Sequence, residues 1–155
     1  MSEIVKNILT LVIFLAVIML PIVIINRQTK RRKQEKMKQK LGHIASKYHL
    51  TIYKEEFLGH KIIALDSVKR TLIFADTLAG EPELVVDLDS YKEVKIVRKE
   101  HEGMVQSICL VLTDKNKQIN VPFYESRVDN EMHLKQISDK TDNWQREIAS
   151  LIKPV

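Results

Sequence analysis

Histidine, cysteine and carboxylate residues are the candidates for metal or acid–base chemistry in this chain of 155 residues. The five histidines stand at positions 43, 49, 60, 101 and 133. They show no HExxH spacing, and a single cysteine, Cys109, accompanies them, so we do not expect a zinc site. Cys109 lies between Ile108 and Leu110 in an apolar run. We interpret it as a small packed side chain and not as a nucleophile.

Asp87 and Asp89 are spaced like the first two ligands of a calcium loop. The next ligand position holds Tyr91 and no glycine stands at Lys92, so we interpret them as carboxylates at a strand end. The four glycines, at 42, 59, 80 and 103, form no phosphate-binding motif. Sequence order leaves open a small-ligand or metal-dependent activity built from dispersed residues such as His60, Asp66, Asp87 and Glu125.

The apolar stretch Ile8–Ile25 contains no charge and indicates where the rest of the chain is located. As a helix it would be roughly 27 Å long, close to the hydrocarbon thickness of a bilayer. We interpret it as a membrane anchor and not as a signal peptide. It is longer than a signal-peptide core, and no small-residue cleavage site follows it.

Cations follow the anchor directly. Residues 27–40 contain eight lysines and arginines and one glutamate, whereas residues 1–26 carry no net charge. The positive-inside rule therefore predicts an inner-membrane protein with its N-terminus outside and its C-terminal part in the cytoplasm. Because the whole chain carries +5, residues 41–155 carry a net charge of −2, and the basic balance gives no reason to expect nucleic-acid binding.

The basic segment is predicted to continue as a helix to about Tyr48, because Met37, Leu41, Ile44 and Ala45 recur at helical spacing. We expect an apolar face that packs on the following domain. The cations are also candidates for contact with anionic lipid headgroups, each contributing about 1 kcal/mol before screening. These candidates are Arg27, Lys30, Arg31, Arg32, Lys33 and Lys36.

After His49 the pattern becomes that of β-strands. Expected strands cover residues 50–57, 61–66, 70–76, 84–88, 94–98, 105–113 and 118–124. The last of these contains Pro122, which cannot donate a ladder hydrogen bond, so we place it at a sheet edge. The segments Glu81–Glu83 and Lys99–Gly103 are predicted to be loops that are free to contact a partner.

A C-terminal helix is predicted from apolar residues at helical spacing, which are Ile137, Thr141, Trp144, Ile148, Leu151 and Ile152. We expect Trp144 to anchor the core, although an exposed aromatic pair with Tyr124 at a peptide groove is an alternative. The chain thus divides into an anchor (1–26), a basic helical linker (27–49) and a β domain with a C-terminal helix (50–155).

The segments IIALDSVKRTLIFAD and VVDLDSYKEVKI resemble strands of the pleckstrin-homology-like (PH-like) domains of bacterial proteins. Together with SICLVLTDKNKQINVPFYES and the helix of Trp144, they are similar to uncharacterised bacterial single-pass membrane proteins. The resemblance spans roughly residues 50–152. It implies an α+β fold, in which an antiparallel sheet or partly open barrel is closed by the last helix. The phosphoinositide-binding Lys-x-Arg motif of eukaryotic members has no clear counterpart here.

These observations favour a membrane-anchored, non-enzymatic interaction module that needs no cofactor and binds a protein, peptide or lipid partner at a sheet edge or beside the last helix. The small-ligand or metal-dependent activity and an accessory subunit of a membrane complex remain the alternatives. A concave pocket that gathers two or more of the dispersed polar residues would favour the ligand alternative, and a filled core would favour the partner.

Overall fold

The structure is a computed structural model that describes residues 3–152. The first two residues of the predicted anchor and the last three of the predicted domain lie outside the described residues. The chain forms two compact units, Met1–Lys40 and Leu41–Val155. The following paragraphs describe each unit by itself.

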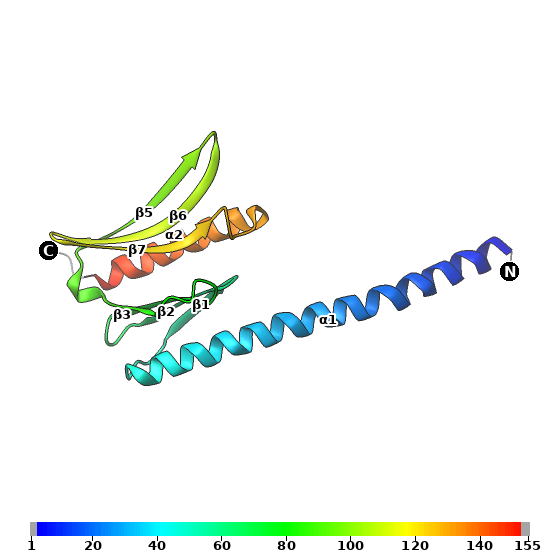
Figure 1. Cartoon of the computed structure of the whole chain (residues 1–155), viewed down its shortest axis with the longest axis horizontal. Coiled ribbons are helices and arrows are strands. Elements are labelled where there is room, and N and C mark those ends of the chain that lie inside the picture. The colour runs from blue at the N-terminus through cyan, green and yellow to red at the C-terminus, as the bar shows by residue number, and fades with distance from the viewer. Residues whose placement is uncertain (1–2, 153–155) are drawn as a thin grey trace. The chain divides into compact units, whose positions relative to one another are not determined.

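The first unit consists of one helix, α1 (Glu3–Lys47), whose last turns belong to the second unit (Figure 1). Within the described part of α1, residues Thr10–Lys47 include a stretch that is long and apolar enough to cross a membrane. The apolar side chains that the structure describes in this stretch are exposed, among them Leu11, Phe14 and Leu20. Pro21 lies inside the helix, as proline does in transmembrane helices more often than in soluble ones. The predicted apolar N-terminal helix is therefore present.

The second unit contains two antiparallel sheets. Sheet A has the strand order β1-β2-β3-β4 and sheet B the order β5-β6-β7. The strands of sheet A are β1 (Lys54–Leu58), β2 (Lys61–Asp66), β3 (Thr71–Asp76) and β4 (Leu84–Asp87). Those of sheet B are β5 (Glu93–His101), β6 (Met104–Asp114) and β7 (Lys117–Glu125). The predicted edge position of Pro122 is confirmed, because β7 has only β6 as a neighbour.

The hairpin of β5 and β6 corrects one expectation. Residues 99–103 were predicted to be a loop, but β5 continues to His101, which pairs with Met104. Glu102 and Gly103, with φ angles of 52° and 78°, form the two-residue turn between them, as type I′ hairpins require. The end of this hairpin is exposed, so its strands lack the alternation of apolar and polar residues by which a half-buried strand is recognised.

Sheets A and B are joined by the 3-10 helix η1 (Leu88–Ser90). The Asp87 carboxylate accepts a hydrogen bond from the backbone N–H of Asp89 and caps this helix. Asp87 is therefore a strand-end carboxylate, as interpreted from the sequence, whereas Asp89 lies in η1.

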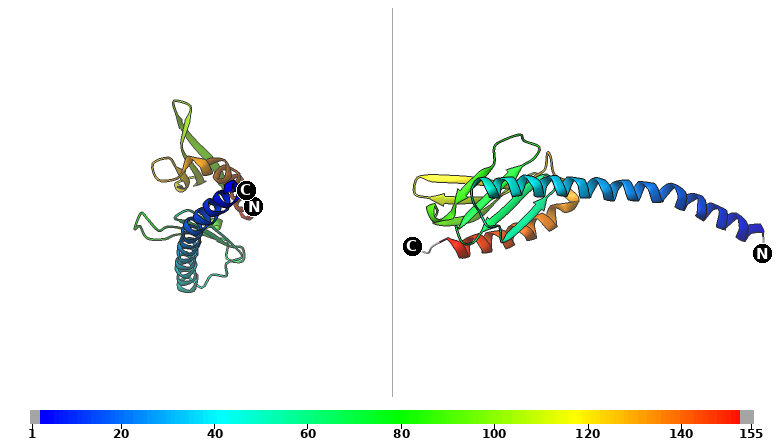
Figure 2. Two further views of the ribbon diagram at one scale, coloured as in Figure 1. Left: turned by 90° about the vertical axis from the view of Figure 1, so that its right-hand side faces the viewer. Right: turned by 90° about the horizontal axis from the view of Figure 1, so that it is seen from below.

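Helix α2 (Leu134–Leu151) follows the short 3-10 helix η2 (Glu131–His133) and runs along sheet B (Figures 1 and 2). Its buried residues are four of the six predicted ones: Ile137, Thr141, Trp144 and Ile148. Ile137, Trp144 and Ile148 join side chains of both sheets in one apolar core. The fold is therefore α+β as predicted, and over residues 3–152 the two sheets do not close into a barrel.

Strands β2 and β3 are buried on both faces, and all six residues of β2 are buried. Their side chains alternate between the apolar core and the opposite face of sheet A, where Ile62 and Ile73 are buried outside the core cluster. Leu41 and Ile44, at the end of α1 that belongs to this unit, are buried as well. This double burial explains why both strands are continuous apolar runs in the sequence.

Candidate functional site

An open hollow of about 540 Å³ lies where the edge strand β7 of sheet B meets one end of sheet A. Strands β3, β4, β6 and β7 and the loop before β4 contribute side chains to it. We call it the acidic groove; it is lined by Phe74, Asp76, Glu81, Pro82, Glu83, Leu84, Cys109, Asn120, Pro122 and Glu125. Two of these strands, β4 and β7, are sheet edges, and strand edges are surfaces to which an extended chain can add.

The apolar part of the groove comes from Phe74, Leu84, Pro122 and the thiol of Cys109. Cys109 is opposite Pro122, next to an irregularity between Ile108 and Cys109 where the register of β6 and β7 shifts. Bulges of this kind re-aim side chains near a sheet edge. The thiol is partly exposed to the hollow, and burial, with a smaller contribution from the charge of Glu125, raises its pKa. A thiol with a raised pKa is a poor nucleophile at neutral pH.

Four carboxylates, and no lysine or arginine, are among the residues that line the groove: Asp76, Glu81, Glu83 and Glu125. These carboxylates differ in the hydrogen bonds and ion pairs that they already make. Asp76 accepts hydrogen bonds from the backbone N–H groups of Leu78 and Ala79, and Glu83 pairs with Lys47 at 2.7 Å. Glu81 is exposed in the loop, and the Glu125 side chain is about half exposed, with a fractional exposure of 47%.

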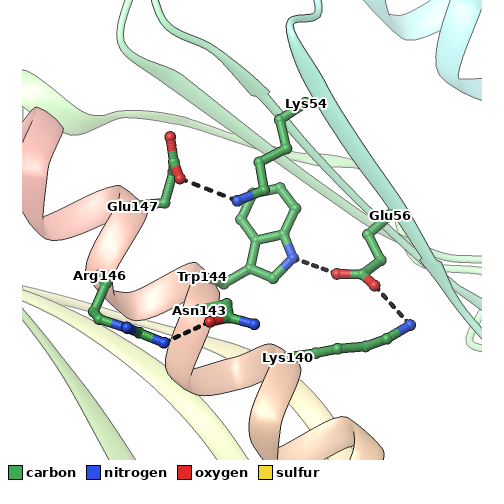
Figure 3. Close-up of a pocket in the computed structure, with 7 residues that line it drawn as sticks. All are labelled: Lys54, Glu56, Lys140, Asn143, Trp144, Arg146 and Glu147. Atoms are coloured by element: carbon green, nitrogen blue, oxygen red, sulfur yellow. Dashed lines mark hydrogen bonds and ion pairs between the residues drawn. The ribbon is translucent and has the colours of Figure 1, made fainter.

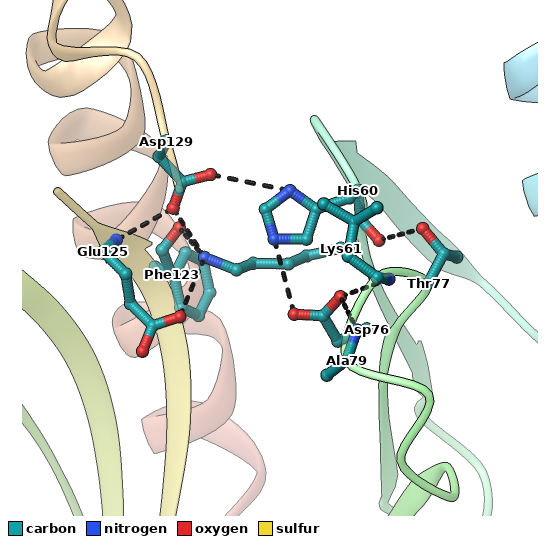
Figure 4. Close-up of polar contacts among 9 residues, drawn as sticks. His60, Lys61, Asp76, Thr77, Ala79, Phe123, Glu125 and Asp129 are labelled. Carbon is teal, nitrogen blue, oxygen red and sulfur yellow. Dashed lines mark hydrogen bonds and ion pairs between the residues drawn. The ribbon is translucent and has the colours of Figure 1, made fainter. Parts of the chain in front are cut away.

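A buried polar cluster lies behind the groove and links the two sheets (Figure 4). Lys61, at the start of β2, is fully buried, and its Nζ lies 2.6 Å from Oδ2 of Asp129, after β7, and 3.9 Å from Glu125 Oε2. The same Asp129 oxygen accepts the backbone N–H of Glu125 at 2.8 Å. The two nitrogens of His60 face carboxylates, with Nε2 3.4 Å from Asp76 and Nδ1 3.8 Å from Asp129. The cluster thus holds Asp76 and Glu125 of the groove in place.

A second hollow, of about 520 Å³, lies between the edge strand β1 and helix α2 (Figure 3). Its polar groups largely satisfy one another. Glu56 accepts hydrogen bonds from the indole N–H of Trp144 at 2.7 Å and pairs with Lys140 at 2.6 Å. Lys54 pairs with Glu147 at 3.1 Å and lies 5.0 Å from the centre of the Trp144 ring. Carboxylates and ammonium groups that already pair with one another have less of their charge left to attract a ligand.

Glu147 also accepts a hydrogen bond from the hydroxyl of Tyr53. Burial, together with this bond to Glu147, raises the pKa of Tyr53 to about 12. The bonds from Tyr53 and Lys54 lower the pKa of Glu147. The expectation that Trp144 anchors the core is confirmed, since the side chain is fully buried and the residue belongs to the core cluster.

The four dispersed residues of the ligand alternative do not all converge on one site, and of the four only Glu125 lines the acidic groove. His60 and Glu125 both belong to the cluster of Lys61 and Asp129, but Asp66 is engaged in a turn and Asp87 caps η1. Burial of Asp66 opposes its ionisation, yet hydrogen bonds from the backbone N–H groups of Lys69, Thr51 and Val68 lower its pKa overall. Among residues 3–152, no group of three His, Cys, Asp or Glu side chains is arranged to hold a metal ion.

The candidate lipid-contacting residues lie on α1, and all six are exposed: Arg27, Lys30, Arg31, Arg32, Lys33 and Lys36. They belong to the first compact unit. Of the acidic groove, the sequence indicated only the loop Glu81–Glu83 as a partner-contacting segment. Cys109 was expected to be a packed side chain, and its place in the groove wall follows from the register shift of β6 and β7. The one signal of that shift in the sequence is Pro122, which pairs with Cys109, because proline within a strand is confined to edges and bulges.

A scan of the chain against protein-family models found no match, and neither did searches of curated proteins and of solved structures.

Proposed function

We propose that this protein is a single-pass, membrane-anchored interaction module that is not an enzyme and whose second unit binds a protein or peptide partner in the acidic groove. The observation that carries the proposal is the groove itself, an open hollow with apolar side chains inside and carboxylates around it. Concave sites with an apolar lining and a few polar groups are the usual binding sites of proteins.

The strand topology supports a binding role by analogy. The resemblance to PH-like domains implies an antiparallel sheet or partly open barrel closed by the last helix, and the two antiparallel sheets and C-terminal helix of this chain are compatible with that expectation. Folds of this kind serve mostly as recognition modules, so the analogy favours a partner over a substrate, although function still has to be argued from the site.

The two parts of the molecule suit different contacts. The six exposed cations from Arg27 to Lys36 are suited to anionic headgroups at the cytoplasmic face of the membrane. The four carboxylates of the groove would repel the same headgroups. We therefore propose that the basic segment contacts lipid and that the groove binds a protein partner.

Site-specific photo-cross-linking in living cells tests the proposal. A photoreactive amino acid replaces Asn120, an exposed residue of the groove wall, in the full-length chain. The matched control carries the same group at Val68, which is 83% exposed in the turn between β2 and β3. We expect a discrete cross-linked protein at position 120 that is absent at position 68. The same products at both positions, or none at either, would contradict the proposal.

A further inference from the structure

We infer that the acidic groove recognises an extended segment of a partner protein that carries lysine or arginine side chains. This inference rests on the proposed function and specifies the chemistry of the partner. It is drawn from three features of the groove, which are its charge, its apolar lining and the two sheet edges beside it.

All charged side chains that line the groove are carboxylates. Four carboxylates face the hollow, and no cationic side chain is among its lining residues. The cations that approach these carboxylates belong to residues outside the lining, since Lys47 reaches Glu83 and Lys61 reaches Glu125. Lys61 is itself engaged by Asp129 at 2.6 Å, so it neutralises Glu125 only in part. Such a rim attracts cations and repels anionic lipids, nucleic acids and acidic peptides.

The apolar lining suits the stems of the same side chains. Phe74, Leu84 and Pro122 offer carbon surface within a hollow of about 540 Å³. Lysine and arginine bury their methylene stems on such surface while the charged end reaches carboxylates at the rim. A compact inorganic cation would not use this surface. The combination therefore favours basic side chains of a polypeptide.

The sheet edges favour an extended conformation of the segment. Strands β4 and β7 each have a neighbour on one side only, and both contribute to the groove. A peptide that adds to such an edge makes main-chain hydrogen bonds and presents alternate side chains to the groove. Cytoplasmic segments that flank transmembrane helices are rich in lysine and arginine. The proposed position of the domain at the membrane therefore brings segments of this chemistry within its reach.

Cys109 provides a direct test, because it is the only cysteine of the chain and lies in the groove wall. The full-length protein in nanodiscs of phosphatidylcholine, a lipid without net charge, is treated with N-ethylmaleimide, a reagent without charge. The probes are two short peptides, one of alternating lysine and threonine and one of alternating glutamate and threonine. We expect the lysine peptide to slow alkylation of Cys109 in a saturable manner and the glutamate peptide to have no effect.

A pair of charge reversals tests the role of the rim. Glu81→Lys changes an exposed carboxylate of the groove, and Glu102→Lys makes the same change at the exposed tip of the β5–β6 hairpin. Glu81→Lys should weaken binding of the lysine peptide by at least about fivefold and Glu102→Lys by less than about twofold. The difference should vanish at about 1 M salt, where the Debye length is about 3 Å. Thermal melts verify that both variants fold, and Glu125→Gln gives an independent groove variant.

Three results would overturn the inference. Equal protection by both peptides would mean that the groove binds chains without regard to charge, which leaves the proposed function intact. Equal weakening by the Glu81 and Glu102 reversals would place peptide binding outside the groove. Absence of protection by either peptide would also overturn it, and the cross-link at position 120 would then decide separately whether the groove has a partner of another chemistry.

Discussion

Trp144 combines two roles in one side chain. It is fully buried in the core between the sheets and α2, and its indole N–H donates to Glu56 of the edge strand β1 at 2.7 Å. Lys54, two residues earlier in β1, lies over the same ring at 5.0 Å. A buried indole contributes a large apolar area and requires a partner for its N–H. The position of the Glu56 carboxylate is thus explained by the hydrogen bond that the buried indole requires, without reference to a ligand.

The first prediction concerns this residue. Trp144→Ala should destabilise the domain by roughly 3 to 5 kcal/mol, because it removes a large buried ring and leaves a cavity. Trp144→Phe should cost less, since it retains part of the ring, and Glu56 keeps its ion pair with Lys140 at 2.6 Å. Differential scanning calorimetry of the full-length chain in detergent compares the two variants. A shift of the melting temperature by only about one or two degrees for the alanine variant would contradict the core assignment.

At the scale of elements, the bond between Lys61 and Asp129 joins strand β2 of sheet A to the segment that follows β7 of sheet B. Lys61 has no exposed surface, and the Asp129 side chain is 8% exposed. A buried ion pair repays the loss of hydration only when both partners remain and further hydrogen bonds satisfy them. Asp129 meets this condition, because it also accepts the backbone N–H of Glu125.

The second prediction is a double-mutant cycle at this pair. Lys61→Met alone should destabilise the protein by about 3 to 5 kcal/mol, because it leaves the Asp129 carboxylate buried without its cation. Asp129→Asn alone should also destabilise, since Lys61 then keeps only weaker partners, the carbonyl of Phe123 at 3.4 Å and Glu125 at 3.9 Å. Combining both changes should cost less than the sum of the two, by about 1 kcal/mol or more. Calorimetry of the four proteins provides the test, and simple additivity would contradict the pairing.

The elements show which parts of this structure the sequence could reveal. The apolar runs of β2 and β3, the proline of β7 and the helical spacing of α2 are local signals, and they located these elements to within a few residues. The exposed end of the β5–β6 hairpin carries no such signal. The acidic groove could not be predicted either, because Asp76 and Glu125 meet there only through the packing of two sheets.

At the scale of the whole molecule, charge is distributed unevenly along the chain. Residues 27–40 contain eight cations and one acidic residue, and residues 41–155 carry a small negative net charge. Within the second unit, negative charge gathers at the groove. A basic segment next to a membrane span directs that side of the chain to the cytoplasm and holds it near anionic lipid. The proposed partner-binding surface has the opposite sign, so the two surfaces do not compete for the same molecules.

The last prediction concerns the orientation of the chain in the membrane. A fluorescent protein that matures only in the cytoplasm, fused to the C-terminus, should be bright, and alkaline phosphatase, active only outside, should be inactive there.

The role of the cations in setting this orientation can be tested as well. Replacing Arg27, Lys30, Arg31 and Arg32 by glutamine, and adding four lysines before the apolar stretch, should reverse both signals, because the excess of cations then precedes the span. The same four lysines added after residue 40 serve as the control and should leave orientation unchanged. Strong phosphatase activity of the unmodified fusion would contradict the cytoplasmic position of the domain, and with it the access of the acidic groove to cytoplasmic basic segments.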